Sequence, residues 1–124
     1  MSWFSKKEIQ ANTKVNWLIL DSENQLATIK DQSNEQPVAI FKHSTRCSIS
    51  SMAKTRLERE WDLNDNEIKI YYLDLITYRS VSNAIEEYFG VEHQSPQLIL
   101  IKNGEVIFHN SHSGIAVSDI KNKL

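Results

Sequence analysis

Cys47 is the only cysteine of the 124-residue chain, and it lies in the polar segment HSTRCSISSMA, residues 43–53. A free cysteine that only fills space usually has apolar neighbours, whereas this one is surrounded by Arg46 and hydroxyl side chains. Ser50 follows three residues later and completes a C-x-x-S pattern, in which the serine can hydrogen-bond to an attacking thiolate but cannot form a disulfide. Any disulfide made at Cys47 must therefore use a sulfur from another molecule. The segment predicts a reactive thiol.

The elements expected around Cys47 explain why its thiol would react. Residues 37–42, PVAIFK, form a nearly continuous apolar run that is typical of a buried strand. After Cys47 the apolar residues recur at every fourth position, as they do along one face of a helix. Cys47 is thus expected at the first turn of a helix, where free N–H groups and aligned peptide dipoles stabilise a thiolate. Arg46 and His43 are expected to add positive charge. Nearby hydroxyls are expected to cap the helix or to donate to sulfur: Ser44, Thr45 and Ser48.

The whole chain alternates between strand and helix patterns. Strands are predicted at 15–20, 37–42 and 67–75, and a hairpin over 97–109 turns at Asn103-Gly104. Helices are predicted at about 22–31, after Cys47, at 81–89 with Gly90 as the end signal, and at about 117–124. The order β-α-β-α-β-α-β-β-α predicts an α/β fold with a mixed sheet and helices on both faces. We divide the chain into an N-terminal extension, residues 1–16, and one domain, residues 17–124.

Composition narrows the class of function. The net charge of −2 gives no electrostatic basis for binding nucleic acid or an anionic membrane. No apolar run approaches the ~20 residues that a membrane helix needs. The first residues lack the features of a signal peptide, and one cysteine favours a reducing compartment, so we expect a cytoplasmic protein. The histidine spacing matches no zinc pattern, and we expect no metal and no bound cofactor.

The segment after the last predicted long helix carries a resemblance to the thioredoxin family. In YFGVEHQSPQLILIKNGEVIF, Val91, Pro96 and the Lys102-Asn103-Gly104 turn match that family's layout, with Gln97 at the usual threonine position and Ile101 at the usual phenylalanine position. The resemblance covers about residues 15–124 and implies a thioredoxin-like fold. It implies further that Pro96 is cis and packs against Cys47, and that the backbone of Ser95 pairs with an incoming substrate.

A closer similarity is to the monothiol bacilliredoxin family, the YtxJ-like proteins. The similar segments are FKHSTRCSISSMA, YYLDLITYRSVSNAI and HQSPQLILIKNGEVIFHNSHSGI. Ser48 departs from the proline that other members often have after the cysteine. The resemblance implies exchange chemistry with bacillithiol or another small thiol as co-substrate, and bacillithiolated proteins as partners. We expect a monomer or a weak dimer.

The expected site combines these residues. We assign the chemistry to Cys47, supported by Arg46, Ser50 and Pro96, and substrate binding to Thr45, Ser95 and His112. In a thioredoxin-like sheet the last strand returns toward the cysteine, which would bring residues 109–114 to the rim of the site. His112 would there contact the thiolate or a carboxylate of a bound thiol, and the alternative is an ordinary surface histidine.

Two functions of other classes stay open. Some C-x-x-S glutaredoxins hold an iron–sulfur cluster between two subunits, but a cluster needs four thiolates, of which two copies of this chain supply two. The other alternative is a thioredoxin-fold module that binds partners without chemistry. The hypothesis carried forward is a monothiol thiol–disulfide oxidoreductase that removes or exchanges small thiols on protein cysteines.

Overall fold

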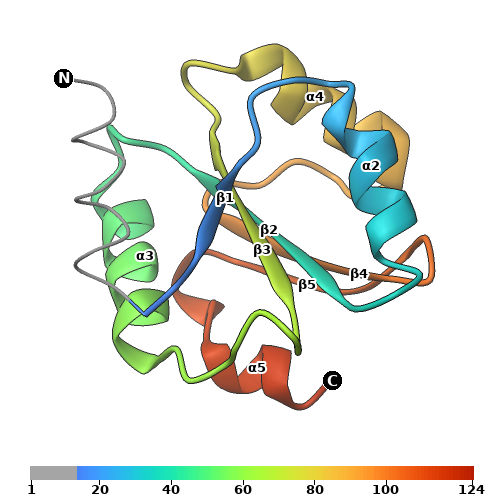
Figure 1. The fold of residues 1–124 in the computed structure, drawn as a ribbon. Helices are drawn as coiled ribbons and strands as arrows, with labels where there is room; N and C mark the ends of the chain where they lie inside the picture. Colours follow the sequence, from blue (N-terminus) through green and yellow to red (C-terminus); the bar gives the residue numbers. More distant parts are fainter. Residues whose placement is uncertain (1–13) are drawn as a thin grey trace, which may run out of the picture.

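The computed structural model describes residues 14–124, so the predicted extension, residues 1–16, lies almost entirely outside the described part (Figure 1). The strands are β1 (Trp17–Ile19), β2 (Val38–His43), β3 (Lys69–Asp74), β4 (Gln97–Lys102) and β5 (Glu105–Ser111). The helices are α2 (Gln25–Gln32), α3 (Ser48–Glu60), α4 (Arg79–Phe89) and α5 (Val117–Lys121), with a 3-10 turn, η1 (His112–Gly114). The element order is the one that the sequence predicts.

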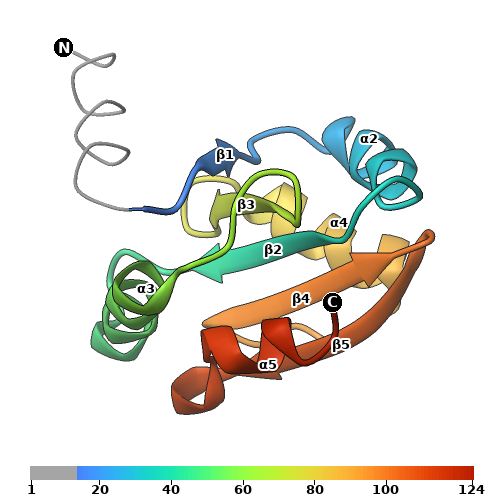
Figure 2. The ribbon, with the colours of Figure 1, turned by 60° about the horizontal axis from the view of Figure 1, so that its bottom comes forward.

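The five strands form one mixed sheet in the order β1-β3-β2-β4-β5. β2 and β1 each pair in parallel with β3, and β4 pairs antiparallel with both β2 and β5. β2 is therefore the central strand, and all six of its residues are buried. The carboxyl ends of β2 and β5 and the amino end of β4 lie together at the same end of the strands (Figure 2). The chain around Cys47 follows β2 at this end of the sheet.

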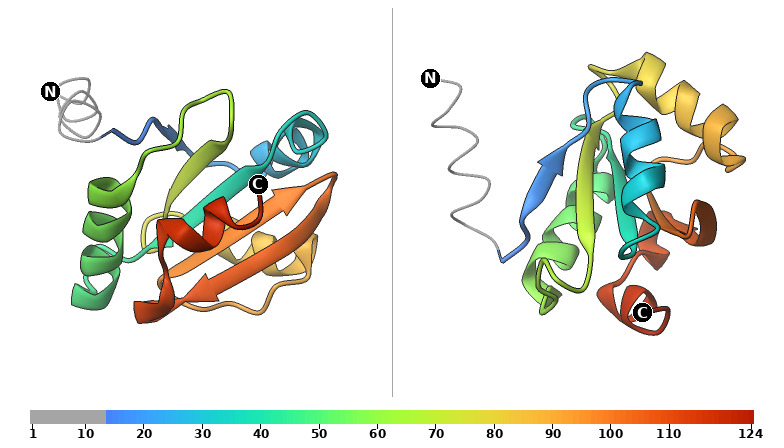
Figure 3. Two further views of the ribbon diagram at one scale, coloured as in Figure 1. Left: turned by 90° about the horizontal axis from the view of Figure 1, so that it is seen from below. Right: turned by 45° about the vertical axis from the view of Figure 1, so that its right-hand side comes forward.

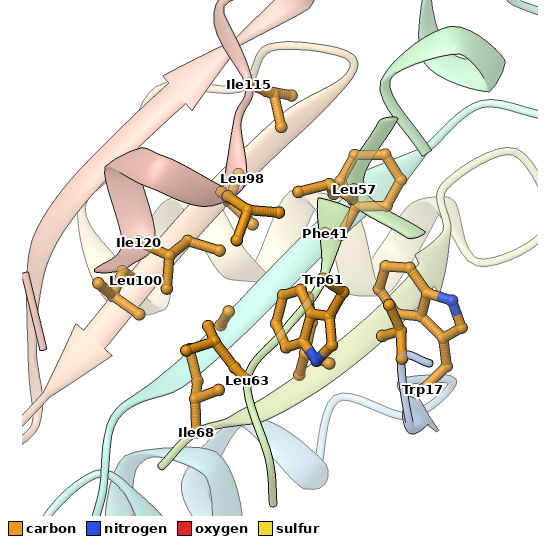
Figure 4. Close-up of a cluster of buried hydrophobic side chains, with 14 of the residues drawn as sticks. Trp17, Phe41, Leu57, Trp61, Leu63, Ile68, Leu98, Leu100, Ile115 and Ile120 are labelled. Atoms are coloured by element: carbon orange, nitrogen blue, oxygen red, sulfur yellow. The ribbon is translucent and has the colours of Figure 1, made fainter. Parts of the chain in front are cut away.

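Helices cover both faces of the sheet, and each face has its own apolar core. Alternate residues of β2 point to opposite faces. Ala39 and Phe41 join the core under α3 and α5, which Figure 4 shows with Leu57 and Ile120 among its members. Val38 and Ile40 join the core under α2 and α4. Figure 3, left, shows α5 in front of the strands and α4 behind them. The aromatic residues of the sheet and of the end of α3 that are at least nine-tenths buried are Trp17, Phe41, Trp61 and Tyr71.

Local sequence signals set several element ends. The Gln25 side chain accepts the backbone N–H of Ser22 at 2.9 Å, which is one half of a capping box, although the helix itself begins at Gln25. Gly90 ends α4 in the left-handed conformation, with φ of 70°. The β4–β5 turn has positive φ at both central residues, Asn103 and Gly104, as a two-residue hairpin turn requires.

Three apolar side chains of the predicted helices are exposed. Ile49 in α3 is 47% exposed, and Ser50 takes the inward position beside Ala53 and Leu57. Tyr88 in α4 and Leu124, which lies beyond the end of α5, are also largely exposed. A repeating four-residue step drifts around a helix with 3.6 residues per turn, so Ile49 falls off the face that Leu57 buries. Among residues 14–124, no helix is long and apolar enough to cross a membrane.

The inward face of α3 can be tested by a pair of alanine variants on that helix. Leu57→Ala should lower the free energy of unfolding by about 2–5 kcal/mol, because the side chain is fully buried in the core under α3. Ile49→Ala removes a side chain of equal size from an exposed position and should change it by about 0.5 kcal/mol or less. Urea unfolding of both variants measures the difference. Equal losses would contradict the orientation of α3 described above.

Candidate functional site

Cys47 lies at the start of α3, directly after the turn that follows β2. Its backbone N–H bonds to the carbonyl of Ser44 at 3.2 Å, and its own carbonyl accepts the N–H of Ser51 at 3.1 Å. Its backbone is extended, with φ of −112° and ψ of 121°, so Cys47 is the residue that caps the helix. The next three residues carry the N–H groups that have no partner within the helix. The half-buried thiol therefore belongs to the positive end of the helix dipole, as predicted.

The side chain at the start of α3 does not cap the helix itself, because Cys47 makes no side-chain capping hydrogen bond. Thr45 and Arg46 are exposed in the turn between β2 and α3. Arg46 is the cation nearest to Cys47 along the chain, and solvent screens its charge.

Ser50 binds the end of β2. Its side chain is fully buried, its Oγ accepts the N–H of Ser44 at 3.0 Å, and the same Oγ lies 2.6 Å from Nδ1 of His43. Because Oγ already accepts from Ser44, its proton is free to be donated to Nδ1. The expected hydrogen bond from Ser50 to an attacking thiolate is thus replaced by two bonds that tie α3 to β2. Ser50 fixes the helix start on which Cys47 stands.

His43 is held neutral by its surroundings. Its ring lies between those of Phe41 and Tyr72, with centroids 5.9 and 5.6 Å away. Burial, followed by the charge of Lys54, lowers the pKa of His43, against the weaker opposing effects of Asp74 and other groups. The prediction that His43 adds positive charge near Cys47 is therefore wrong, because a buried imidazole resists taking up a proton.

The segment between α4 and β4 leads to the start of β4, which pairs with the end of β2 just before Cys47. The Ser95–Pro96 peptide bond is cis, as the thioredoxin resemblance implies, and Pro96 is buried. Gln97, which is 1% exposed, donates from Nε2 to the carbonyl of Glu92 at 3.0 Å and accepts the N–H of Gln94 at 3.4 Å. The buried amide of Gln97 therefore links the backbone of Glu92 and Gln94 to the start of β4.

Lys42 reaches the same segment from the central strand. It is 1% exposed, and its Nζ lies 2.6 Å from Nδ1 of His93. His43, its neighbour in β2, points to the opposite face of the sheet, toward α3. The last two residues of β2 thus bind two neighbouring parts of the chain. His43 binds the start of α3 through Ser50, and Lys42 binds the segment before β4 through His93.

η1 completes the rim at the end of β5. The N–H of His112 bonds to the carbonyl of Pro96 at 3.0 Å, and η1 contacts α3 (Figure 3, left). His112 is exposed and has φ of 58°, a left-handed backbone that costs energy in a residue with a side chain. Asn110 supports the turn by donating to the carbonyl of Gly114 at 2.7 Å. The sequence prediction that residues 109–114 return to the Pro96 end of the sheet is confirmed for the backbone of His112.

Sequence reasoning missed the Lys42–His93 pair and the inward role of Ser50. The signal for the first was present, because a lysine in a fully buried strand needs a polar partner from a neighbouring element. Asp74 holds the loop after β3, accepting from the N–H groups of Ile76 and Thr77 at 3.1 and 3.2 Å. Within residues 14–124, no group of three or more His, Cys, Asp or Glu side chains could hold a metal ion.

Comparison with known proteins gives a family match and fold matches. A family model described as Monothiol bacilliredoxin BrxC matches residues 19–120. A solved structure described as an oxidoreductase with a thioredoxin fold is 30% identical, with a TM-score of 0.72 over 85% of this chain and 90% of that chain. Thioredoxin from Malassezia sympodialis is 16% identical, with a TM-score of 0.67 and 90% of each chain covered. Thioredoxin from Trypanosoma brucei brucei is 14% identical, with a TM-score of 0.65 and 87% of each chain covered. The fold is that of thioredoxin.

The tie between α3 and β2 predicts a loss of stability in Ser50→Ala. The variant leaves the buried Nδ1 of His43 and the N–H of Ser44 without their partner, which should lower the free energy of unfolding by about 1–3 kcal/mol. Ser51→Ala, one residue further along α3 and exposed, is the matched control and should change it by about 0.5 kcal/mol or less. Urea unfolding at neutral pH compares the two. A Ser50→Ala protein as stable as the control would contradict this assignment.

The neutral state of His43 predicts a loss of stability in acid. The folded pKa of His43 lies below the ordinary value of 6.5, so below that pH the unfolded chain binds more protons than the folded one. This contribution to stability is complete above pH 6.5 and is lost as the pH falls toward the folded pKa. His93 is shifted in the same direction and adds to the loss.

His43→Phe keeps a ring between Phe41 and Tyr72 but removes the His43 imidazole, one of the two groups whose pKa is lowered. Urea unfolding at pH 7 and pH 5 should give a smaller difference for this variant than for the unchanged protein. An equal difference would show that His43 is not the source of the acid effect.

Proposed function

Since the chain belongs to the monothiol bacilliredoxin family, we propose that it removes bacillithiol or a similar small thiol from protein cysteines by means of Cys47. The family and the thioredoxin fold give the chain a role of thiol oxidoreductase type. The single observation that best supports the finer proposal is the position of the only cysteine, half-buried at the cap of α3. A thiol there stands at the positive end of the helix and is open to a second sulfur.

The proposed exchange has two steps that balance. The Cys47 thiolate attacks the small-thiol sulfur of a mixed disulfide; a bond forms between those two sulfurs, and the protein sulfur leaves as a thiolate that takes a proton from water. A second small thiol, as its thiolate, then attacks the adduct at the small-thiol sulfur. This breaks the bond to Cys47, releases the Cys47 thiolate and joins the two small-thiol sulfurs in a disulfide. In each step a thiolate attacks and another thiolate leaves.

The surrounding residues would act on binding and orientation. Ser50 holds the start of α3 in place and has no sulfur with which to form an internal disulfide. Arg46 would favour the thiolate by its charge. Thr45, Ser95 and His112 come from the turn before Cys47, the segment before Pro96 and the turn after β5, and we propose that they bind the small thiol and the substrate backbone.

Mass spectrometry after mixing with bacillithiol disulfide tests the chemistry. The chain should gain one bacillithiol, removable by reductant, and Cys47→Ser should gain none. Arg46→Ala should slow alkylation of Cys47 at neutral pH by about two- to fivefold, because an exposed charge contributes up to about 1 kcal/mol. Arg59→Ala, which removes an exposed arginine from the far end of α3, is the matched control and should leave the rate unchanged. Absence of an adduct on Cys47 would refute the proposal.

Partner capture separates exchange from binding without chemistry. A catalytic thiol predicts that proteins captured as mixed disulfides are lost when Cys47 becomes serine. A thioredoxin-fold interaction module would keep the same partners in the Cys47→Ser protein, and that result would favour the alternative function.

A further inference from the structure

Lys42 is buried at the end of the central strand although it carries a charge. It is 1% exposed and shares the α2–α4 face of β2 with the apolar residues Val38 and Ile40. Lysine is almost never fully buried unless it is paired, because removing an ammonium group from water is costly. An apolar side chain of similar length would fill the same space without that cost. The benefit of a lysine here must therefore lie in what its ammonium group binds.

That partner is the ring of His93, in the segment that leads to the cis-proline. Nζ of Lys42 lies 2.6 Å from Nδ1 of His93, and Oγ of Ser82 in α4 lies 3.4 Å from the same nitrogen. The neutral ring of His93 faces Lys42 from the segment, and two charged groups, Arg79 and Glu86, act on it from α4. No charged side chain of the adjoining strand β4 acts on it, since its register partner there is the neutral Gln97.

The charges of this cluster decide which group donates. Burial lowers the pKa of Lys42 to about 8, with Glu86 opposing and Arg79 adding to the shift, so the amine is still protonated at neutral pH. Burial also lowers the pKa of His93, and the charge of Lys42 adds to this, so the ring stays neutral. The ammonium group of Lys42 therefore donates to Nδ1, and the ring proton of His93 is on Nε2. A charge-assisted hydrogen bond of this kind is short and directional.

The bond fixes the middle of a segment that is otherwise held at its ends. Val91 anchors the segment to the core under α4, and Gln97 closes it from the β4 side. His93 lies between these two points, two residues before Ser95. Its bond to Lys42 ties the segment to β2, the same strand whose next residue, His43, holds the start of α3.

We propose that Lys42 is a positioning residue for substrate docking, holding the segment 92–96 through His93 so that the backbone at Ser95 is fixed beside Cys47. The proposal rests on the proposed thiol exchange, in which this segment binds the substrate. Lys42 does not touch the substrate and does not act on the Cys47 sulfur. Its loss should therefore weaken docking and leave the reactivity of the thiol unchanged.

The test measures docking and thiol reactivity separately. The substrate is a peptide whose single cysteine is disulfide-linked to bacillithiol, and alkylation by iodoacetamide reports the Cys47 thiolate without any docking. Lys42→Met should raise KM about tenfold, the effect of losing one hydrogen bond to a charged group, with kcat and the alkylation rate within about twofold. Lys102→Met, an exposed lysine at the far end of β4, is the control and should leave KM unchanged.

Variants of His93 complete the test. His93→Leu should raise KM as Lys42→Met does, and the double variant should be no worse than either single one, because both remove the same bond. His93→Asn puts an amide oxygen near the place of Nδ1 and should restore most of the lost affinity. KM unchanged in both Lys42→Met and His93→Leu would overturn the proposal. So would a fall in the alkylation rate of Cys47 that accounts for the lost activity of Lys42→Met. If Lys42→Met does not fold, the two His93 variants decide.

A readout without substrate distinguishes failure of this proposal from failure of the proposed function. Hydrogen exchange of the backbone N–H of Gln94 and Ser95 should be faster in His93→Leu than in the unchanged protein, because the segment has lost its middle support. If the unchanged protein does not react with the peptide, the proposed function has failed, and faster exchange in His93→Leu still supports the Lys42–His93 tie. Unchanged exchange would overturn it.

Discussion

The complete burial of β2 is the constraint on which the site depends. A central strand flanked by two cores has no access to water along its length, so a polar side chain on it needs a partner from an adjoining element. Lys42 and His43, its last two residues, point to opposite faces and find such partners in His93 and Ser50. One strand end therefore locates both the helix start that carries Cys47 and the segment that carries Pro96.

This arrangement determines how charge is distributed around the thiol. The imidazoles of His43, which is buried, and of His93, which is half-buried, both disfavour protonation, so neither brings a full positive charge to the site at neutral pH. The cation of Lys42 lies on the far face of the sheet, bound to His93. What remains near Cys47 is the positive end of α3 and the exposed guanidinium of Arg46. The peptide dipoles do not titrate, so their effect on the thiol is independent of pH.

The sequence predicts the elements well where the signals are local. The Asn103-Gly104 turn, Gly90 and the strand–helix order follow from residues that are close along the chain, and so does the position of Cys47 at a helix start. Contacts between elements do not follow from these local signals. Whether Ile49 or Ser50 points inward depends on where α3 lies against the sheet, and the pairing of Lys42 with His93 joins residues 51 positions apart. Partners of buried polar residues are set by tertiary packing, which hydropathy patterns do not encode.

The commitment of Ser50 to His43 and Ser44 changes how the C-x-x-S pattern is understood. In a C-x-x-C site the second side chain must be free to approach the first, because its sulfur closes the disulfide. Here the equivalent position is buried, and two hydrogen bonds direct its oxygen to the end of β2. A serine at this position therefore does more than remove a second sulfur, since it makes the start of α3 a fixed support for Cys47. Such a site has no internal disulfide to form, so the sulfur for any disulfide at Cys47 has to be supplied by an external molecule.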